Sequence, residues 1–184
     1  MSCSILSTGR NLPCLKSVGG IKSIILVDFG ALGTLSVTGA EVTTISETPA
    51  AYQYLVKPGS SGMEETITAS AENGTVYYDQ NVNIQLQKLD KDTQAELQDV
   101  AKGNPHVFVQ DFNSNYFLVG AYNGADVSAG TIGTGTALAD FTGFNLTFTA
   151  QEQLPAFFCA RAFIALFLFL NIYYAKCEII TLYY

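Results

Sequence analysis

The sequence predicts a mainly β fold, a β-sandwich or β-barrel with one long β-hairpin and one packed α-helix. Thr, Val, Ile, Tyr and Phe are common, and 16 glycines are spread along 184 residues. This composition favours short strands joined by turns. Only the segment near residues 93–102 has a helical pattern, and an Asn-Gly pair at residues 73–74 lies between two strand-like segments, as a tight hairpin requires.

Size and charge limit the possible functions. At 184 residues and 19.8 kDa the chain has the length of one domain with its own core. The formal net charge is −7, and Lys and Arg total only 9. Because tight nucleic-acid binding normally needs a basic patch to neutralise phosphates, we do not expect it here. The first 20 residues lack the pattern of a secretory signal, so we expect synthesis and use in a cytoplasm.

Three strands are expected before the long hairpin. Residues 21–28, IKSIILVD, form an apolar run that ends at a turn, which is typical of a buried strand. Residues 30–40 are expected to form a loop or short strand. Two further strands, at residues 41–46 and 51–57, are separated by Pro49, which cannot donate to a strand ladder.

The segment from residue 63 to residue 89 predicts the long hairpin. A type I′ turn centred on Asn73 and Gly74 would pair Glu72 with Thr75 and Thr68 with Asp79. Side chains alternate between the two faces of a strand. One face then carries the following residues, with Glu65 and Gln80 as polar exceptions: Met63, Ile67, Ala69, Ala71, Val76, Tyr78, Val82, Ile84 and Leu86.

The opposite face of this hairpin is polar almost throughout and carries no Lys or Arg. A face of this kind cannot form a core, so it must meet water, either inside a channel or outside a particle. Its members are Glu64, Thr66, Thr68, Ser70, Glu72, Thr75, Tyr77, Asp79, Asn81, Asn83, Gln85 and Gln87.

A single helix is expected after the hairpin. Thr93 and Glu96 have the spacing of a capping box, Leu97 lies in a narrow apolar stripe, and Gly103 and Pro105 end the pattern. Because the stripe is narrow, we expect the helix to pack on the outside of the sheet, away from any lumen.

The next segments predict a second hairpin, a loop and a strand. Residues 106–111 and 115–120 flank a turn, and residues 143–150 alternate apolar with uncharged polar side chains. Residues 121–140 between them are rich in Gly, Thr and Ala and predict a loop. Neither this loop nor the first 20 residues can bury itself in one subunit, so we expect both to make contacts between subunits or rings.

No catalytic, cofactor-binding or metal-binding residues are predicted, and we do not expect an enzyme. His106 alone could serve as a histidine base, and no nucleophile motif accompanies it, so a structural role is expected. The four cysteines include no CxxC pair and are expected to be free thiols. The glycines of residues 130–135 lack the GK[ST] motif of a phosphate-binding loop.

The composition changes abruptly near the C-terminus. Residues 158–184 are crowded with Phe, Leu, Ile and Tyr and contain no glycine, so we expect a domain at residues 1–157 followed by an apolar tail of doubtful origin. The uninterrupted apolar run is about half of the ~18 residues that a membrane helix needs, so we expect no membrane association. One hypothesis is that the tail is translated out of the natural frame.

The order of these features resembles that of bacteriophage tail tube proteins. The resemblance rests on the start, CSILSTGRNLPCLKSVGGIKSIILVDF, on the Asn-Gly hairpin, and on NPHVFVQDFNSNYFLVGAYNGADVSAGTIGTGTALADFTGFNLTFTAQEQLPA, and it covers residues 1–156. It implies a β-barrel or sandwich with one packed helix. It also implies hexameric rings whose inner sheets join into a continuous barrel around a lumen. Related tubes occur in type VI secretion systems and contractile bacteriocins.

The resemblance selects the channel for the polar hairpin face. It implies a virion protein of the tail, assembled in the host bacterial cytoplasm, that conducts DNA during ejection without binding it tightly. Its partners would be itself, in rings and stacks, and other tail proteins such as a baseplate, a terminator and a sheath. The alternatives are a head–tail connector or decoration protein, and a small enzyme. The residues expected to face the lumen are Glu64, Thr66, Thr68, Glu72, Asp79, Asn81, Asn83, Gln85 and Gln87.

Overall fold

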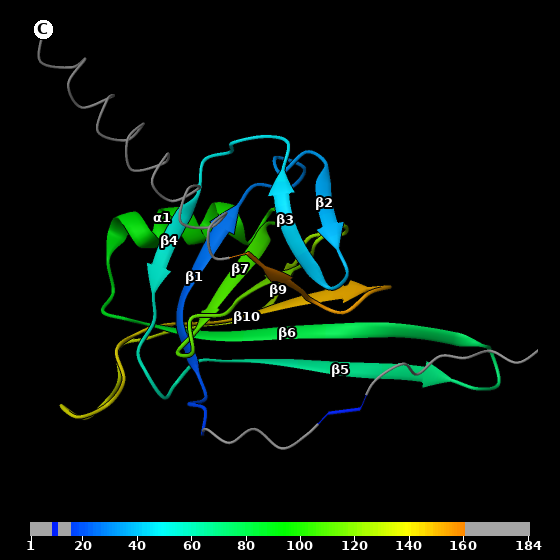
Figure 1. Ribbon diagram of the computed structural model, residues 1–184. Helices are drawn as coiled ribbons and strands as arrows, with labels where there is room; N and C mark the ends of the chain where they lie inside the picture. The colour runs from blue at the N-terminus through cyan, green and yellow to red at the C-terminus, as the bar shows by residue number, and fades with distance from the viewer. Residues whose placement is uncertain (1–8, 11–15, 161–184) are drawn as a thin grey trace, which may run out of the picture.

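The protein folds as two β-sheets packed face to face, with one helix at the side of the core (Figure 1). The structure is a computed structural model, which describes residues 9–10 and 16–160. The mainly β fold with one helix is therefore confirmed. The sheets form an open sandwich and not a closed barrel.

The larger sheet has seven strands and contains the strands predicted near the N-terminus. Its order is β2 (Leu35–Thr38), β3 (Glu41–Ile45), β11 (Phe157–Cys159), β8 (Tyr116–Val119), β7 (His106–Asp111), β1 (Ile21–Val27) and β4 (Tyr52–Leu55). β7 and β8 form the second predicted hairpin.

The smaller sheet has four antiparallel strands and contains the long hairpin. Its order is β5 (Gly62–Ser70), β6 (Thr75–Gln87), β10 (Gly143–Glu152) and β9 (Asp126–Gly133). β6 is the longest strand, and both β5 and β10 pair along it.

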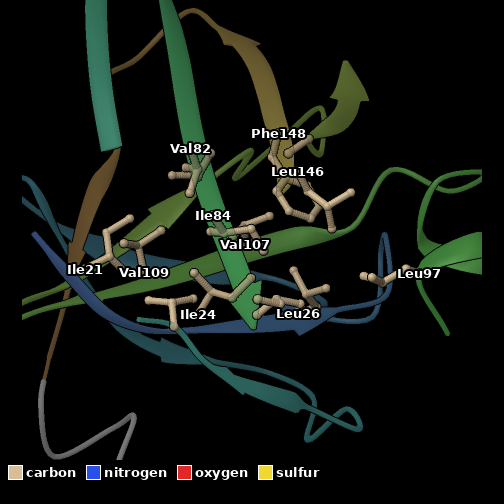
Figure 2. Close-up of a cluster of buried hydrophobic side chains, with 14 of the residues drawn as sticks. Ile21, Ile24, Leu26, Val82, Ile84, Leu97, Val107, Val109, Leu146 and Phe148 are labelled. Carbon is tan, nitrogen blue, oxygen red and sulfur yellow. The ribbon is translucent and has the colours of Figure 1, made fainter. Parts of the chain in front are cut away.

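The main core lies between the two sheets (Figure 2). Ile24 and Val107 from the larger sheet and Val82, Ile84 and Phe148 from the smaller one are at most 1% exposed. Each buried side chain of this size contributes roughly 1.5–3 kcal/mol relative to an exposed one. The alternating apolar residues of β6 and β10 therefore hold the smaller sheet against the larger sheet.

A second cluster covers the other face of the larger sheet. It includes Ile25 and Val27 of β1, Phe108 of β7 and Leu32 of the loop after β1. β1 is therefore buried on both faces, which explains why its sequence is a continuous apolar run without alternation.

The helix α1 (Lys91–Val100) begins two residues earlier than predicted. Asp90 is the N-cap, and its carboxylate accepts a hydrogen bond from the Thr93 backbone N–H at 3.4 Å, so the predicted cap at Thr93 is wrong. Leu97 is buried in the main core, as predicted.

The register of the long hairpin differs from the predicted one by two residues. Ser70 pairs with Thr75 and Thr68 with Tyr77, so residues 71–74 form a four-residue loop. Gly74 has a φ of 64°, whereas Asn73 does not have a positive φ, so the turn is not type I′. Because the shift equals one full pleat period, every side chain that remains in the two strands stays on its predicted face, whereas Ala71 and Glu72 now lie in the loop.

Residues 121–140 are not a simple loop, because they contain strand β9. Its backbone pairs with β10 from Asp126 to Gly133, with a bulge beside Thr147. Ladder hydrogen bonds hold this strand although it has few bulky side chains to bury. The sequence pattern could not reveal this, since β9 lies at a sheet edge and its residues are mostly exposed.

The expected domain boundary at residue 157 falls inside β11. This strand pairs antiparallel with β8 and parallel with β3, and Phe157 and Cys159 are buried in the second cluster. The domain therefore includes residues 158–160. Within the described part of the chain, no helix is long and apolar enough to cross a membrane. The apolar segment 161–184 lies outside the described residues.

Candidate functional site

The outward face of the four-stranded sheet, here called the polar face, is the candidate functional surface. The strand registers place eight of the nine residues expected to face a lumen on this side: Glu64, Thr66, Thr68, Asp79, Asn81, Asn83, Gln85 and Gln87. The ninth, Glu72, lies exposed in the hairpin loop, so strand alternation does not assign it to a face.

β10 extends the polar face, which the sequence did not show. Asn145, Thr147, Thr149 and Gln151 stand directly opposite Gln85, Asn83, Asn81 and Asp79 of β6. Directly opposed residues project to the same side of a sheet. The alternation of β10 was visible in the sequence, but its pairing with β6 spans about sixty residues and could not be read from any local pattern.

Hydrogen bonds link the side chains of the polar face into short chains. Asp79 accepts from the Thr68 hydroxyl at 3.3 Å and from the Gln151 amide at 2.8 Å. The Thr149 hydroxyl donates to the Asn81 amide oxygen at 2.9 Å. These hydrogen bonds satisfy polar groups of the polar face, so fewer donors and acceptors remain available to a ligand.

The charge of the polar face is negative. None of the four strands β5, β6, β9 and β10 contains Lys or Arg, whereas Glu64 and Asp79 place carboxylates on the face. A surface with one sign of charge repels polyanions such as nucleic acids.

The other side of the hairpin is apolar, but only its base is buried. Val82, Ile84 and Leu86 lie in the core, whereas Ile67 and Val76 toward the tip are 64% and 53% exposed. Figure 1 shows the β5–β6 hairpin running beyond the rest of the domain. The prediction of a dry apolar face therefore holds for the base of the hairpin and is wrong for the tip of this isolated chain.

The two polar exceptions on the apolar side, the buried Gln80 and the exposed Glu65, are linked by a hydrogen bond. Gln80 is 1% exposed, and its amide N–H donates to Glu65 at 3.2 Å and to the Leu154 carbonyl at 3.3 Å. Its amide oxygen accepts from the Gly120 backbone N–H at 3.1 Å. These bonds tie the hairpin to the larger sheet and to the segment after β10.

Both edges of the four-stranded sheet are unpaired within the described part of the chain. β5 and β9 each pair with one neighbour, and neither contains Lys or Pro, which commonly prevent edge-to-edge association. The bulge beside Thr147 disturbs only one position of β9. These edges leave backbone N–H and C=O groups available for pairing with another chain.

His106 has a structural role. It is 3% exposed, its Nδ1 lies 2.6 Å from the Gly120 carbonyl, and its Nε2 accepts from the Gly30 N–H at 3.1 Å. Burial lowers the pKa of His106, so the ring is held neutral with its proton on Nδ1. Phe29 stacks on the ring at 5.3 Å.

Among the described residues, the only cysteine lies in the core. Cys159 is a buried free thiol, and burial, aided by Glu41, raises its pKa to about 12, so it is not a reactive thiolate. Among residues 9–10 and 16–160, no group of three or more His, Cys, Asp or Glu side chains could hold a metal ion. Cys3, Cys14 and Cys177 lie outside these residues.

Comparisons with family models, with curated protein sequences and with solved structures give no significant match in any of the three.

Proposed function

We propose that this chain is the structural subunit of a phage tail tube, which assembles into stacked hexameric rings and conducts DNA during ejection. The observation that carries the proposal is the polar face: a wide, lysine-free and arginine-free sheet surface on a domain whose sheet edges are open. The resemblance of residues 1–156 to tail tube proteins supports it.

The open edges suit a ring closed by strand pairing. β5 of one copy would pair with β9 of the next, which would satisfy the free backbone groups of both edges. Six copies of a four-stranded sheet give 24 strands. With strands ~4.8 Å apart and tilted by ~40°, such a barrel is roughly 45–50 Å wide between backbones, which leaves room for a DNA duplex.

The exposed hairpin tip also suits assembly. Ile67 and Val76 would be covered by a neighbouring subunit, because apolar side chains that project beyond the core gain stability when a partner removes them from water.

The composition of the polar face suits passage of DNA without binding. Glu64 and Asp79 repel phosphates, and the linked hydroxyl and amide groups offer no cation. In a ring, the weak electric fields of these carboxylates add together, because a narrow lumen focuses them. DNA would therefore meet no adhesive site.

Negative-stain electron microscopy of the purified full-length protein tests the proposal. We expect hollow six-fold rings or tubes at high protein concentration. A monodisperse monomer under the same conditions contradicts the proposal. Rings found only at the head–tail junction of virions, or single copies on the capsid, would instead identify a connector or a decoration protein.

A further inference from the structure

A pocket of about 360 Å³ lies at the end of β1, and none of its lining residues belongs to the polar face. Its floor contains Leu26 and Val27 of β1 and Val100 of α1. Phe29 and Tyr52 also line the pocket, and both are exposed, by 55% and 51%. Two exposed aromatic rings beside one pocket are a large apolar surface for a small domain.

The remaining groups around the pocket favour a cation. Asp28, Glu96 and Asp99 line it, and no Lys or Arg does. The Tyr54 hydroxyl donates to Glu96 at 2.7 Å, which fixes that carboxylate against β4. Asp99 forms a salt bridge with the exposed Lys102, with a distance of 3.1 Å between Nζ and Oδ1.

The end of α1 adds to this preference. Its last turn contains no basic residue, and the residues that follow it, including Gly103 and Asn104, line the pocket. The carbonyl end of a helix carries a partial negative charge. Carboxylates, aromatic faces and a helix C-terminus together recognise a guanidinium or ammonium group.

The chain itself carries two such groups near its start. Arg10 and Lys16 are both exposed and precede Val18. The Val18 backbone is held by Asn113, which accepts from its N–H at 3.0 Å and donates to its carbonyl at 2.7 Å. This attachment lies just before the first residue of β1, whereas the pocket lies at the last residues of the same strand.

The attached Val18 and the pocket therefore lie near opposite ends of the seven-residue strand β1, roughly 23 Å apart. Complementary surfaces at opposite ends of a subunit join copies head to tail and not as a closed symmetric pair. Copies of a chain with a net charge of −7 repel one another, and a contact between opposite charges reduces this repulsion.

We infer that the pocket formed by Phe29, Tyr52 and Glu96 binds the guanidinium group of Arg10 from a second copy, and that this contact joins successive rings. The inference rests on the proposed tube for the place of the contact, but the binding reaction can be measured without a tube. Arg10 is assigned in place of Lys16 because a planar guanidinium stacks on aromatic rings, and because Lys16 lies only two residues from the anchored Val18.

Calorimetric titration of the full-length protein with a peptide of residues 9–19 tests the binding. An Arg10→Gln peptide should bind about 5- to 30-fold more weakly, whereas a Lys16→Gln peptide should lose much less. In the protein, Tyr52→Ala should weaken binding about 5-fold or more. The matched control is Tyr122→Ala, because Tyr122 is equally exposed at 53% but lies outside this pocket.

A second variant shows whether weaker binding comes from the loss of a contact or from misfolding of the protein. Glu96→Gln keeps an acceptor for Tyr54 but removes the charge, and it should also weaken peptide binding, whereas Glu72→Gln in the hairpin loop should not. Equal affinities of the Arg10→Gln and unchanged peptides, or equal effects of Tyr52→Ala and Tyr122→Ala, would overturn the inference.

Mixing two full-length variants distinguishes a second copy from the same chain. An Arg10→Gln chain keeps its pocket, and a Tyr52→Ala chain keeps its arginine, so together they should form one-to-one pairs more tightly than either variant associates alone. No pairing in the mixture would overturn the contact between copies. Tubes of normal length from Arg10→Gln protein would overturn the inference but would agree with the proposed tube function. Peptide binding as expected, without any rings, would contradict the tube function but would agree with the proposed binding site.

Discussion

Replacement of Gln80 by Met tests the assignment of faces in the long hairpin. Gln80 and Gln87 lie in the same strand, seven positions apart, so they project to opposite sides of the sheet. Gln80 is buried with three hydrogen bonds, whereas Gln87 is exposed on the polar face. Met has nearly the same shape as Gln, so the change removes hydrogen bonds without leaving a large cavity.

The expected cost follows from the partners that lose a bond. The Gly120 N–H is buried and its bond is to the Gln80 oxygen, so leaving it unsatisfied costs about 1–3 kcal/mol. Glu65 and the Leu154 carbonyl lie closer to solvent and together add about 1 kcal/mol. A loss of about 2–4 kcal/mol corresponds to a melting temperature lower by about 5–15 °C for a domain of this size.

Thermal denaturation followed by circular dichroism measures this difference. Gln80→Met should melt about 5–15 °C lower than the unchanged protein, and Gln87→Met should stay within about 2 °C, as exposed substitutions normally do. Equal melting temperatures for the two variants would refute the alternation of faces on which the polar face depends.

Three other outcomes are expected. Leu97→Ala should lower the free energy of unfolding by about 2–4 kcal/mol in urea denaturation, because Leu97 is the buried residue of α1, and a neutral result would mean that the helix is not docked. Burial lowers the pKa of His106 in the folded state, so below pH ~6.5 the unfolded chain binds a proton that the folded chain does not, and stability should fall as the pH drops from 7.5 to 5.5. His106→Gln should reduce this slope, and an unchanged slope would contradict the neutral buried ring. A variant that combines Glu64→Lys, Glu72→Lys and Asp79→Lys reverses the charge on the hairpin. It should leave rings intact but slow DNA release from virions more at low salt than at high salt. Release at the normal rate at low salt would contradict a lumen position.

Local patterns in the sequence predicted most of the larger elements. The apolar run of residues 21–28 and the alternation around residues 63–87 depend on burial of one or two faces, which leaves a direct trace in residue type. The polar face of the hairpin was predicted because a shift of two residues in register leaves alternation unchanged. The turn itself was predicted wrongly, because Asn-Gly also fits a four-residue loop in which only Gly74 has positive φ.

Features that depend on distant pairing could not be predicted. β9 has few bulky residues and is held by ladder bonds to β10, and β11 joins two strands that are far apart in the chain. The pocket beside α1 combines Phe29, Tyr52 and Glu96, which no spacing in the sequence relates. Gln80 appeared only as an exception to a pattern, since its partners lie 15, 40 and 74 positions away.

Electron cryomicroscopy of assembled full-length protein, or of tails from virions that contain it, tests the central claim most directly. The account predicts a tube of stacked six-fold rings in which β5 and β9 of adjacent subunits pair and the polar face lines the lumen. Density that places Asn81, Asn83 and Gln85 on the outer surface of the tube, or an assembly without a lumen, would contradict it.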